Sequence, residues 1–233
     1  MSKLYDSIIK NDSSDISITY REMNDYKTIS YKELREYIDR AVDTLSEDQL
    51  SDLEQSVFPY AAKIEKKVKD LLAVHRNKQF ELWLEQARIA CQPNYALNPV
   101  ISPTISFSIY PNSLYTSEED VNNYERKMVW ALSSMDNIKW WHRNISRLGF
   151  MINGPVHAYP DIIAMTKSGK LLMIETKGDH LDNEESRLKA KIGHQWDSLA
   201  GAKYRYFMVF ETKSPEYPGA YSYDRFMEII QAL

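Results

Sequence analysis

Two short apolar runs in the second half of the chain predict a β-hairpin. They lie between Pro160 and Lys177 and are separated by Lys167-Ser168-Gly169, which places a glycine where the last residue of a three-residue loop needs positive φ. Both faces of the two strands carry apolar residues, so we expect helices to cover both sides of the sheet. We expect the second half of the chain to be organised around this hairpin.

Charged side chains gather at one end of the predicted hairpin. If Thr166 and Lys170 close the loop, pairing outward places Asp161 directly opposite Glu175, and paired side chains lie about 5 Å apart at Cβ. Side chains alternate along a strand, so Lys177 shares a face with Glu175. Two carboxylates and an ammonium are therefore expected to meet at the end of an otherwise apolar strand pair.

This group of charges indicates a divalent metal site. Two converging carboxylates repel each other unless a positive charge lies between them. Mg²⁺ prefers oxygen ligands, so we expect it to bind Asp161, Glu175 and the backbone carbonyl of Thr176, with Mn²⁺ as a substitute. Lys177 would stand beside the ion, where it could orient or activate a water and offset charge on a scissile phosphate. An ordinary surface hairpin with the same three charged residues is the alternative that this pattern alone leaves open.

The surrounding pattern predicts the order helix, strand, strand, strand, helix, strand, helix. Capping-box spacing starts the first helix at Ser117 with Asp120, and the second at Asp182 with Glu185. The last two predicted elements are an alternating strand at 203–212 and an amphipathic helix at 223–233.

The first half of the chain is predicted to be mostly helical. Apolar residues recur at three- and four-residue steps between Ser30 and Leu45, and Pro59 is suited to the first turn of a further helix. A connector is marked by Pro93, Pro99 and Pro103. We therefore divide the chain into a helical region with its connector at 1–115 and an α/β domain at 116–233.

Composition limits which cellular compartment and which class of protein we expect for this chain. No apolar stretch approaches the roughly 20 residues of a membrane helix, and the N-terminus lacks the features of a signal peptide. The single Cys91 excludes an intramolecular disulfide and argues against a thiolate zinc site. A cytoplasmic location without membrane partners is the simplest expectation. The net charge of −4 argues against an autonomous high-affinity DNA binder, but less against a catalytic domain whose acidic ligands lower the total.

Several linked motifs resemble a known nuclease family. Asp161 at the start of one strand and Glu175-Thr176-Lys177 at the end of the next resemble the PD-(D/E)xK superfamily. The span from about Asn122 to Phe210 is similar to the C-terminal endonuclease domain of type III restriction enzyme Res subunits and related helicase-linked nucleases. The segments that carry the resemblance are Trp140-Trp141-His142-Arg143-Asn144, Tyr159-Pro160-Asp161-Ile162-Ile163, Glu175-Thr176-Lys177-Gly178-Asp179-His180-Leu181, Lys189, Gly193, Trp196 and Tyr204-Arg205-Tyr206-Phe207-Met208-Val209.

The resemblance implies a restriction-endonuclease-like α/β core, with a mixed central sheet and helices on both faces. It implies that Asp161 and Glu175 bind the catalytic metal and that Lys177 assists the attacking water. Glu125 matches an acidic residue that supports the metal site in such nucleases, and Lys189 matches a basic position on the following helix. The residues expected to contact nucleic acid are Arg143, Asn144, His142, Lys189 and Gln195.

Aromatic and basic residues stand side by side in Trp140-Trp141-His142-Arg143. This combination suits base stacking and phosphate contact. It suits a domain core equally well, with tryptophans buried and arginine stems packed against them. The sequence leaves that choice open for Trp140 and Trp141.

The function implied by the resemblance is a Mg²⁺-dependent DNA endonuclease of a type III restriction-like system that acts in phage defence. Expected partners are double-stranded DNA, a helicase or translocase domain, and a modification or recognition subunit. The chain has no Gly-x-x-x-x-Gly-Lys-Ser/Thr loop, so it contains no expected ATP site and is either part of a longer enzyme or a stand-alone relative. The alternatives are a structure-specific repair or resolvase-type nuclease and a non-catalytic DNA-binding or assembly module, and the residues alone leave RNA open as a substrate.

Overall fold

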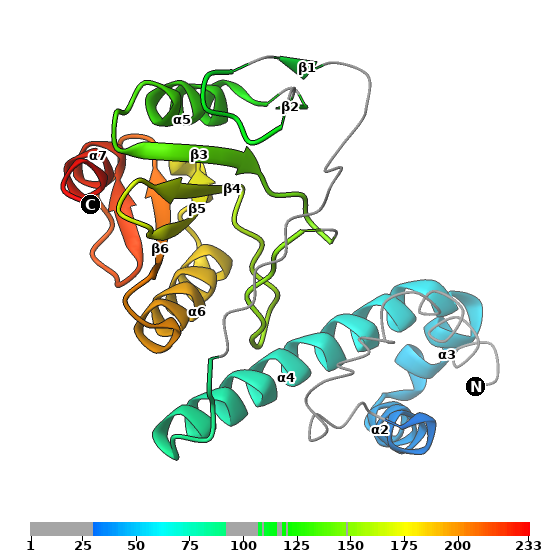
Figure 1. The fold of residues 1–233 in the computed structure, drawn as a ribbon. Coiled ribbons are helices and arrows are strands. Elements are labelled where there is room, and N and C mark those ends of the chain that lie inside the picture. The colour runs from blue at the N-terminus through cyan, green and yellow to red at the C-terminus, as the bar shows by residue number, and fades with distance from the viewer. Residues whose placement is uncertain (1–29, 92–106, 109, 116–117, 120, 148) are drawn as a thin grey trace. The chain divides into compact units, whose positions relative to one another are not determined.

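The computed structural model describes residues 30–91, 107–108, 110–115, 118–119, 121–147 and 149–233. The chain divides into two compact units, the first ending at Gln86 and the second beginning at Ala87 (Figure 1). The segment before residue 116 contributes to the second unit, because the amide of Trp141 donates to Asn112 and the amide of Leu114 donates to Trp141. Most of the predicted proline-rich connector lies outside the described residues.

The described part of the first unit, residues 30–86, is helical. It contains α2 (Tyr31–Asp43), α3 (Glu47–Gln55) and α4 (Val57–Glu85). Ser30 and Ser46 cap the first two helices in capping boxes with Glu33 and Gln49, which satisfies amide groups that a helix start leaves free. Pro59 lies in the first turn of α4, where its missing N–H costs nothing, although the helix begins two residues earlier. The small core contains Ile38, Leu53 and Ala61.

The second unit is built on a mixed five-stranded sheet. Its strands, in spatial order, are β3 (Ile138–Arg143), β4 (Ile162–Thr166), β5 (Leu171–Lys177), β6 (Tyr204–Phe210) and β7 (Ala220–Ser222). The first three strands pair antiparallel, and the last three pair parallel. A separate antiparallel pair joins β1 (Phe107–Ser108) to β2 (Glu118–Glu119).

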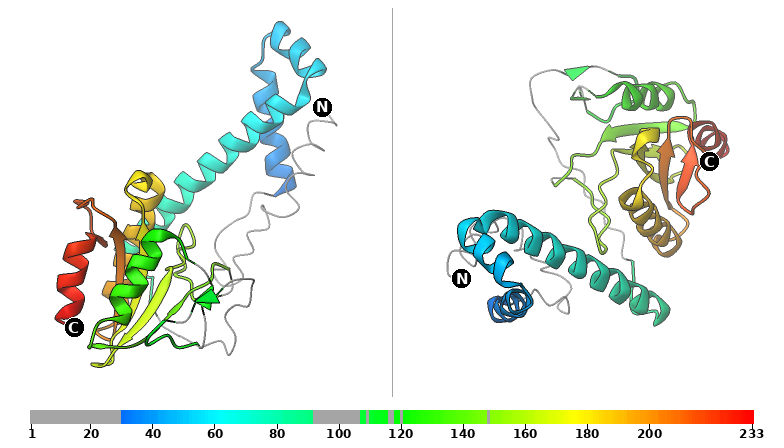
Figure 2. Two further views of the ribbon diagram at one scale, coloured as in Figure 1. Left: turned by 90° about the horizontal axis from the view of Figure 1, so that it is seen from above. Right: turned by 180° about the vertical axis from the view of Figure 1, so that it is seen from behind.

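Helices cover both faces of this sheet, as the apolar pattern predicted (Figures 1 and 2). The helices are α5 (Asn123–Ser133), α6 (Glu184–Ala200) and α7 (Tyr223–Gln231), with a short 3₁₀ helix η1 (Asp179–Leu181) after β5. On one face, Met128 of α5 and Phe226 of α7 share a buried cluster with Ile174 of β5. On the other face, α6 packs so closely that a Cβ on Gly193 would lie 2.1 Å from the ring of Tyr206.

The register of the central hairpin is the one predicted. Ile162 pairs with Ile174, the amide of Thr166 donates to the carbonyl of Lys170 at 2.9 Å, and Gly169 has a φ of 87°. Continuing this pairing by one residue places Asp161 opposite Glu175. The loop glycine and the period-two alternation are local features, so the sequence was sufficient to define the register.

The starts of α5 and α6 differ from the predicted ones. Helix α5 is capped by Asn122 in a capping box with Glu125, because Glu118–Glu119 form strand β2 instead of a helical turn. Ser117 and Asp120, which the sequence favoured, lie outside the described residues. Helix α6 is capped by Asn183, whose side chain accepts from the amide of Ser186.

Asp182 was predicted to cap α6, but its carboxylate has other partners. It accepts a 3.4 Å hydrogen bond from the hydroxyl of Tyr217 and lies 3.5 Å from both Arg187 and Lys213. Across the described ranges, no helix is both long enough and apolar enough to cross a membrane.

Candidate active site

Asp161 lies immediately before β4 and is held by the neighbouring strand. Its Oδ2 accepts hydrogen bonds from the amide of Thr176 at 2.7 Å and from the hydroxyl of Thr176 at 2.8 Å. Its backbone carbonyl accepts from the amide of Asn144 at 2.8 Å. Burial raises the pKa of Asp161, and the two Thr176 bonds and the charge of Lys177 partly offset that rise. The carboxylate is therefore fixed in position although it is poorly solvated.

Glu175 on β5 is the second carboxylate, and it is more deeply buried. It is 4% exposed, and its Oε1 lies 2.7 Å from Nζ of Lys177. Its Oε2 is buried and has no hydrogen-bond partner within the described part of the chain. Burial and the charge of Asp161 raise the pKa of Glu175 to about 7, against the opposing pull of Lys177 and Lys189. One oxygen of this carboxylate is thus paired, and the other is left for an additional ligand.

Lys177 is the last residue of β5 and carries a positive charge at neutral pH. Burial by itself lowers the pKa of Lys177, but the carboxylates of Glu175, Asp161 and Glu185 outweigh it and raise the pKa above its ordinary value. An ammonium has three donors and no acceptor. In this state Lys177 can orient a water or stabilise negative charge, but it cannot accept a proton.

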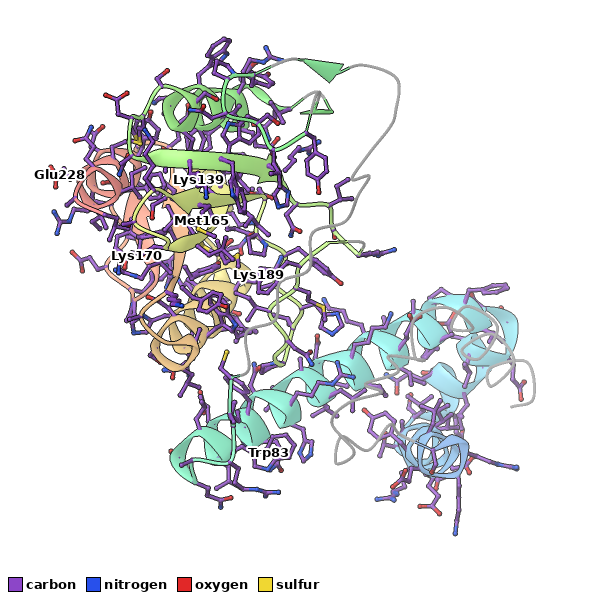
Figure 3. All side chains as sticks on the ribbon, in the orientation of Figure 1. Trp83, Lys139, Met165, Lys170, Lys189 and Glu228 are labelled. Carbon is purple, nitrogen blue, oxygen red and sulfur yellow. The ribbon has the colours of Figure 1, made fainter. Side chains whose placement is uncertain are left out.

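Two further ion pairs flank the carboxylates. Glu125, at the start of α5, lies 3.9 Å from Arg143 at the end of β3. Burial and the charge of Asp161 raise the pKa of Glu125, which places Glu125 within the electrostatic range of the site. Lys189 on α6 (Figure 3) lies 2.7 Å from Glu185, and its charge also lowers the pKa of Glu175. The structure therefore gathers Glu125, Arg143 and Lys189 around the hairpin end.

Asn144 was predicted to contact nucleic acid, but its side chain is used inside the protein. Its Nδ2 donates to the carbonyls of Phe150 and Pro160, both at 2.8 Å, and its Oδ1 accepts from the amide of Phe150 at 2.7 Å. Gly149 is required here, because a Cβ at this position would lie 2.0 Å from that Oδ1. Asn144 thus ties the loop after β3 to the backbone next to Asp161.

The aromatic segment of β3 mainly serves the core. Trp141 is fully buried, and its indole N–H donates to Ser133 at 3.0 Å and to the carbonyl of Pro111 at 3.1 Å. His142 is 2% exposed, lies 2.7 Å from the carbonyl of Arg143, and has its pKa lowered by burial. Half-buried Trp140 stacks on His142 at a ring distance of 6.0 Å. A buried, neutral imidazole is poorly suited to bind phosphate, so the structure favours a packing role for His142.

Gln195 lies farther along α6 than Lys189, the other predicted contact residue on this helix. It is half-buried on α6, six residues after Lys189, which corresponds to about 9 Å along the helix axis. Glu185 and Lys189, whose charges act on the site, lie in the N-terminal half of the same helix. The charged α6 residues that act on the carboxylates therefore lie in the first half of the helix.

Two features of the site were not found from the sequence. The side chain of Thr176 donates a hydrogen bond to Asp161, whereas the sequence suggested a role only for its backbone carbonyl, as a metal ligand. Tyr206 on β6 is 1% exposed, and its hydroxyl has no partner among the residues that the structure describes. A tyrosine inside an otherwise apolar alternating strand was the available signal for the second feature.

The donor set fits a hard cation such as Mg²⁺. Within the described ranges, no three His, Cys, Asp or Glu side chains lie together as a metal-binding group. Mg²⁺ commonly needs only one or two protein carboxylates, with water and substrate as its other ligands. Asp161 and Glu175, with the unpaired Oε2, match that requirement. Metal support from Glu125 and from the carbonyl of Thr176 stays a prediction.

Comparison with protein-family models, with curated proteins and with solved structures found no match for this chain.

Proposed function

We propose that the second unit is a Mg²⁺-dependent endonuclease with a PD-(D/E)xK core, which hydrolyses phosphodiester bonds in double-stranded DNA. One observation carries this proposal. Two carboxylates, the half-buried Asp161 just before β4 and the buried Glu175 on β5, converge here, and the ammonium of Lys177 lies 2.7 Å from one oxygen of Glu175. Burying such charges is costly, and a purely structural strand end has no need of them.

The roles of the metal ligands follow from their contacts. Asp161 and Glu175 would hold Mg²⁺, and the carbonyl of Thr176 would be a third protein oxygen. When bound, the ion supplies an activated water and neutralises charge on the phosphate. Thr176 fixes the rotation of Asp161, and Lys177 occupies one oxygen of Glu175. The carboxylates are thus oriented before any substrate arrives.

The cations of the site have separate roles in this proposal. Lys177 donates hydrogen bonds to the attacking water and stabilises the charge that develops on the scissile phosphate. Arg143 and Lys189, which flank the carboxylates in ion pairs of their own, contact neighbouring phosphates of the DNA backbone. These contacts position the strand without reading its sequence.

The larger context that we propose is a type III restriction-like, ATP-dependent system. It rests on the resemblance of the motifs from Trp140 to Val209 and is supported by the antiparallel hairpin followed by helix α6 and parallel strand β6. In that system a translocating motor and a recognition subunit would bring DNA to the site. The net charge of −4 agrees with a catalytic domain that depends on partners for DNA affinity.

A plasmid cleavage assay with the full chain tests the proposal. We expect cleavage with Mg²⁺ at low salt, no cleavage with EDTA, and a loss of about 10²- to 10⁴-fold in Asp161→Ala and Lys177→Ala. Lys167→Ala is the control, because Lys167 lies in the loop at the opposite end of the hairpin. Branched DNA and RNA tested in parallel define the substrate. Equal cleavage by wild type, Asp161→Ala and Lys177→Ala would refute the proposal.

A further inference from the structure

Tyr206 is enclosed beside Glu175 on the side of the sheet that α6 covers. In the parallel pairing of β5 with β6, Tyr206 lies next to Met173, and Glu175 lies two residues farther along β5. Residues two apart point to the same face of a sheet, so Tyr206 and Glu175 share that face. Gly193 of α6 lies directly on the tyrosine ring, where a Cβ would approach three ring carbons to within 2.1–2.4 Å.

Two polar atoms in this enclosed region have unused hydrogen-bonding capacity. The hydroxyl of Tyr206 and Oε2 of Glu175 are both buried, and neither has a hydrogen-bond partner in the described residues. The charges of Glu175 and Asp161, after burial itself, raise the pKa of Tyr206, so the hydroxyl lies within their electrostatic range. A phenylalanine would fill the same ring space without a buried hydroxyl, so the hydroxyl needs an explanation.

We propose that Tyr206 is a positioning residue whose hydroxyl is linked to Oε2 of Glu175 through one enclosed water. The proposal deepens the proposed nuclease function, on which its consequence for metal binding rests. A carboxylate oxygen has two lone pairs, so Oε2 can accept a hydrogen bond from this water with one and bind a cation with the other. Lys177 already holds Oε1. The two donors together would fix the rotation of the carboxylate about its last side-chain torsion, which is otherwise broad.

The expected consequence is a preorganised metal ligand. Outer hydrogen-bond partners of metal ligands commonly change metal affinity by about 10- to 100-fold, because they fix the orientation of the ligand. Tyr206→Phe keeps the ring and its contact with Gly193 and removes only the hydroxyl. Tyr204→Phe is the matched control, since Tyr204 lies on the same face of β6 and packs edge-to-face on Trp196.

The first experiment tests the contact without metal. Thermal unfolding of the full chain in EDTA at pH 8 is measured for Tyr206→Phe, Glu175→Met and the double variant. We expect Tyr206→Phe to lower the midpoint by about 2–4 °C when Glu175 is present, and to have no such effect in the Glu175→Met background. A Tyr206→Phe midpoint that is unchanged or raised in the Glu175 background would overturn the proposal, because the hydroxyl would then be a buried group without a partner.

The second experiment measures Mn²⁺ affinity by calorimetry. We expect about tenfold weaker binding in Tyr206→Phe, unchanged binding in Tyr204→Phe, and no binding in Glu175→Met. If wild type binds Mn²⁺ but Tyr206→Phe binds it equally well, the positioning role is wrong and the nuclease proposal stands. If wild type binds no Mn²⁺ while the unfolding cycle shows coupling, the Tyr206 contact stands and the nuclease proposal fails.

Discussion

Oδ2 of Asp161 accepts two hydrogen bonds from Thr176, one from its amide at 2.7 Å and one from its hydroxyl at 2.8 Å. Thr176 stands between Glu175 and Lys177 on β5. One residue therefore links the carboxylate at the start of β4 to the strand that carries the other two charged groups of the site. The relative positions of all three depend on this contact as well as on the strand pairing.

Removing the hydroxyl of Thr176 tests this link. In Thr176→Val the amide bond to Asp161 remains and the hydroxyl bond is lost, so the carboxylate gains rotational freedom. We expect cleavage to fall about tenfold, with Mn²⁺ affinity falling in parallel. Thr176→Ser keeps a hydroxyl at the same position and should retain most of the activity. Equal rates in wild type and Thr176→Val would show that the amide alone positions Asp161.

The raised pKa of Glu175 predicts a specific dependence of stability on pH. The pKa is about 7 in the folded protein and 4.5 ordinarily, so between these values the folded state binds more protons than the unfolded state. The free energy of unfolding should therefore fall as pH rises from about 4.5 to about 7, by about 3 kcal/mol in total, and then level off. Urea unfolding in EDTA across this pH range measures it.

Glu175→Gln is the matching variant for this titration, because it removes the titrating group and keeps the shape. We expect the free energy of unfolding to decline less between pH 4.5 and 7. The decline that remains comes from Asp161, whose pKa is also raised by burial. At pH 8, Glu175→Gln should have a higher free energy of unfolding than wild type. A decline that is identical in both proteins would place the titration on other groups.

Asn144→Ala distinguishes a structural role from a DNA contact. The variant loses three hydrogen bonds that join the loop after β3 to Phe150 and Pro160, and it leaves buried backbone groups unpaired. We expect a loss of about 2–3 kcal/mol in stability, seen as a lower unfolding midpoint. DNA affinity below that midpoint should be unchanged, measured by fluorescence anisotropy. A weaker DNA affinity with normal stability would instead support the direct contact predicted from the sequence.

In the proposed complex, Glu185 would compete with DNA for Lys189. Its carboxylate lies 2.7 Å from the ammonium, and 69% of its side chain is exposed, so an incoming phosphate can displace it. We expect Glu185→Gln to bind DNA about two- to threefold more tightly at low salt, with the difference disappearing as salt rises. Glu184→Gln makes the same charge change on an exposed neighbouring residue of the same helix turn. Equal gains in both variants would indicate a general charge effect.

Helix starts show where local patterns were insufficient. The sequence analysis expected α5 to start at Ser117 with Asp120, whereas the structure uses Asn122 with Glu125, which has the same spacing. Pairing of Glu118–Glu119 with Phe107–Ser108 selects the second start. A contact between segments about ten residues apart decided between two locally acceptable solutions.

The central hairpin, its register and the convergence of Asp161, Glu175 and Lys177 follow from the sequence alone. Loop chemistry and period-two alternation are local, and they act within a span of 18 residues. Three other features depend on tertiary packing: Asn144 binds the loop after β3, Thr176 holds Asp161 through its side chain, and Tyr206 is buried on the same sheet face as Glu175. The residue type alone does not show whether a side chain forms its hydrogen bonds with solvent, substrate or protein. Its partner is set by the packing of segments that lie far apart in the chain.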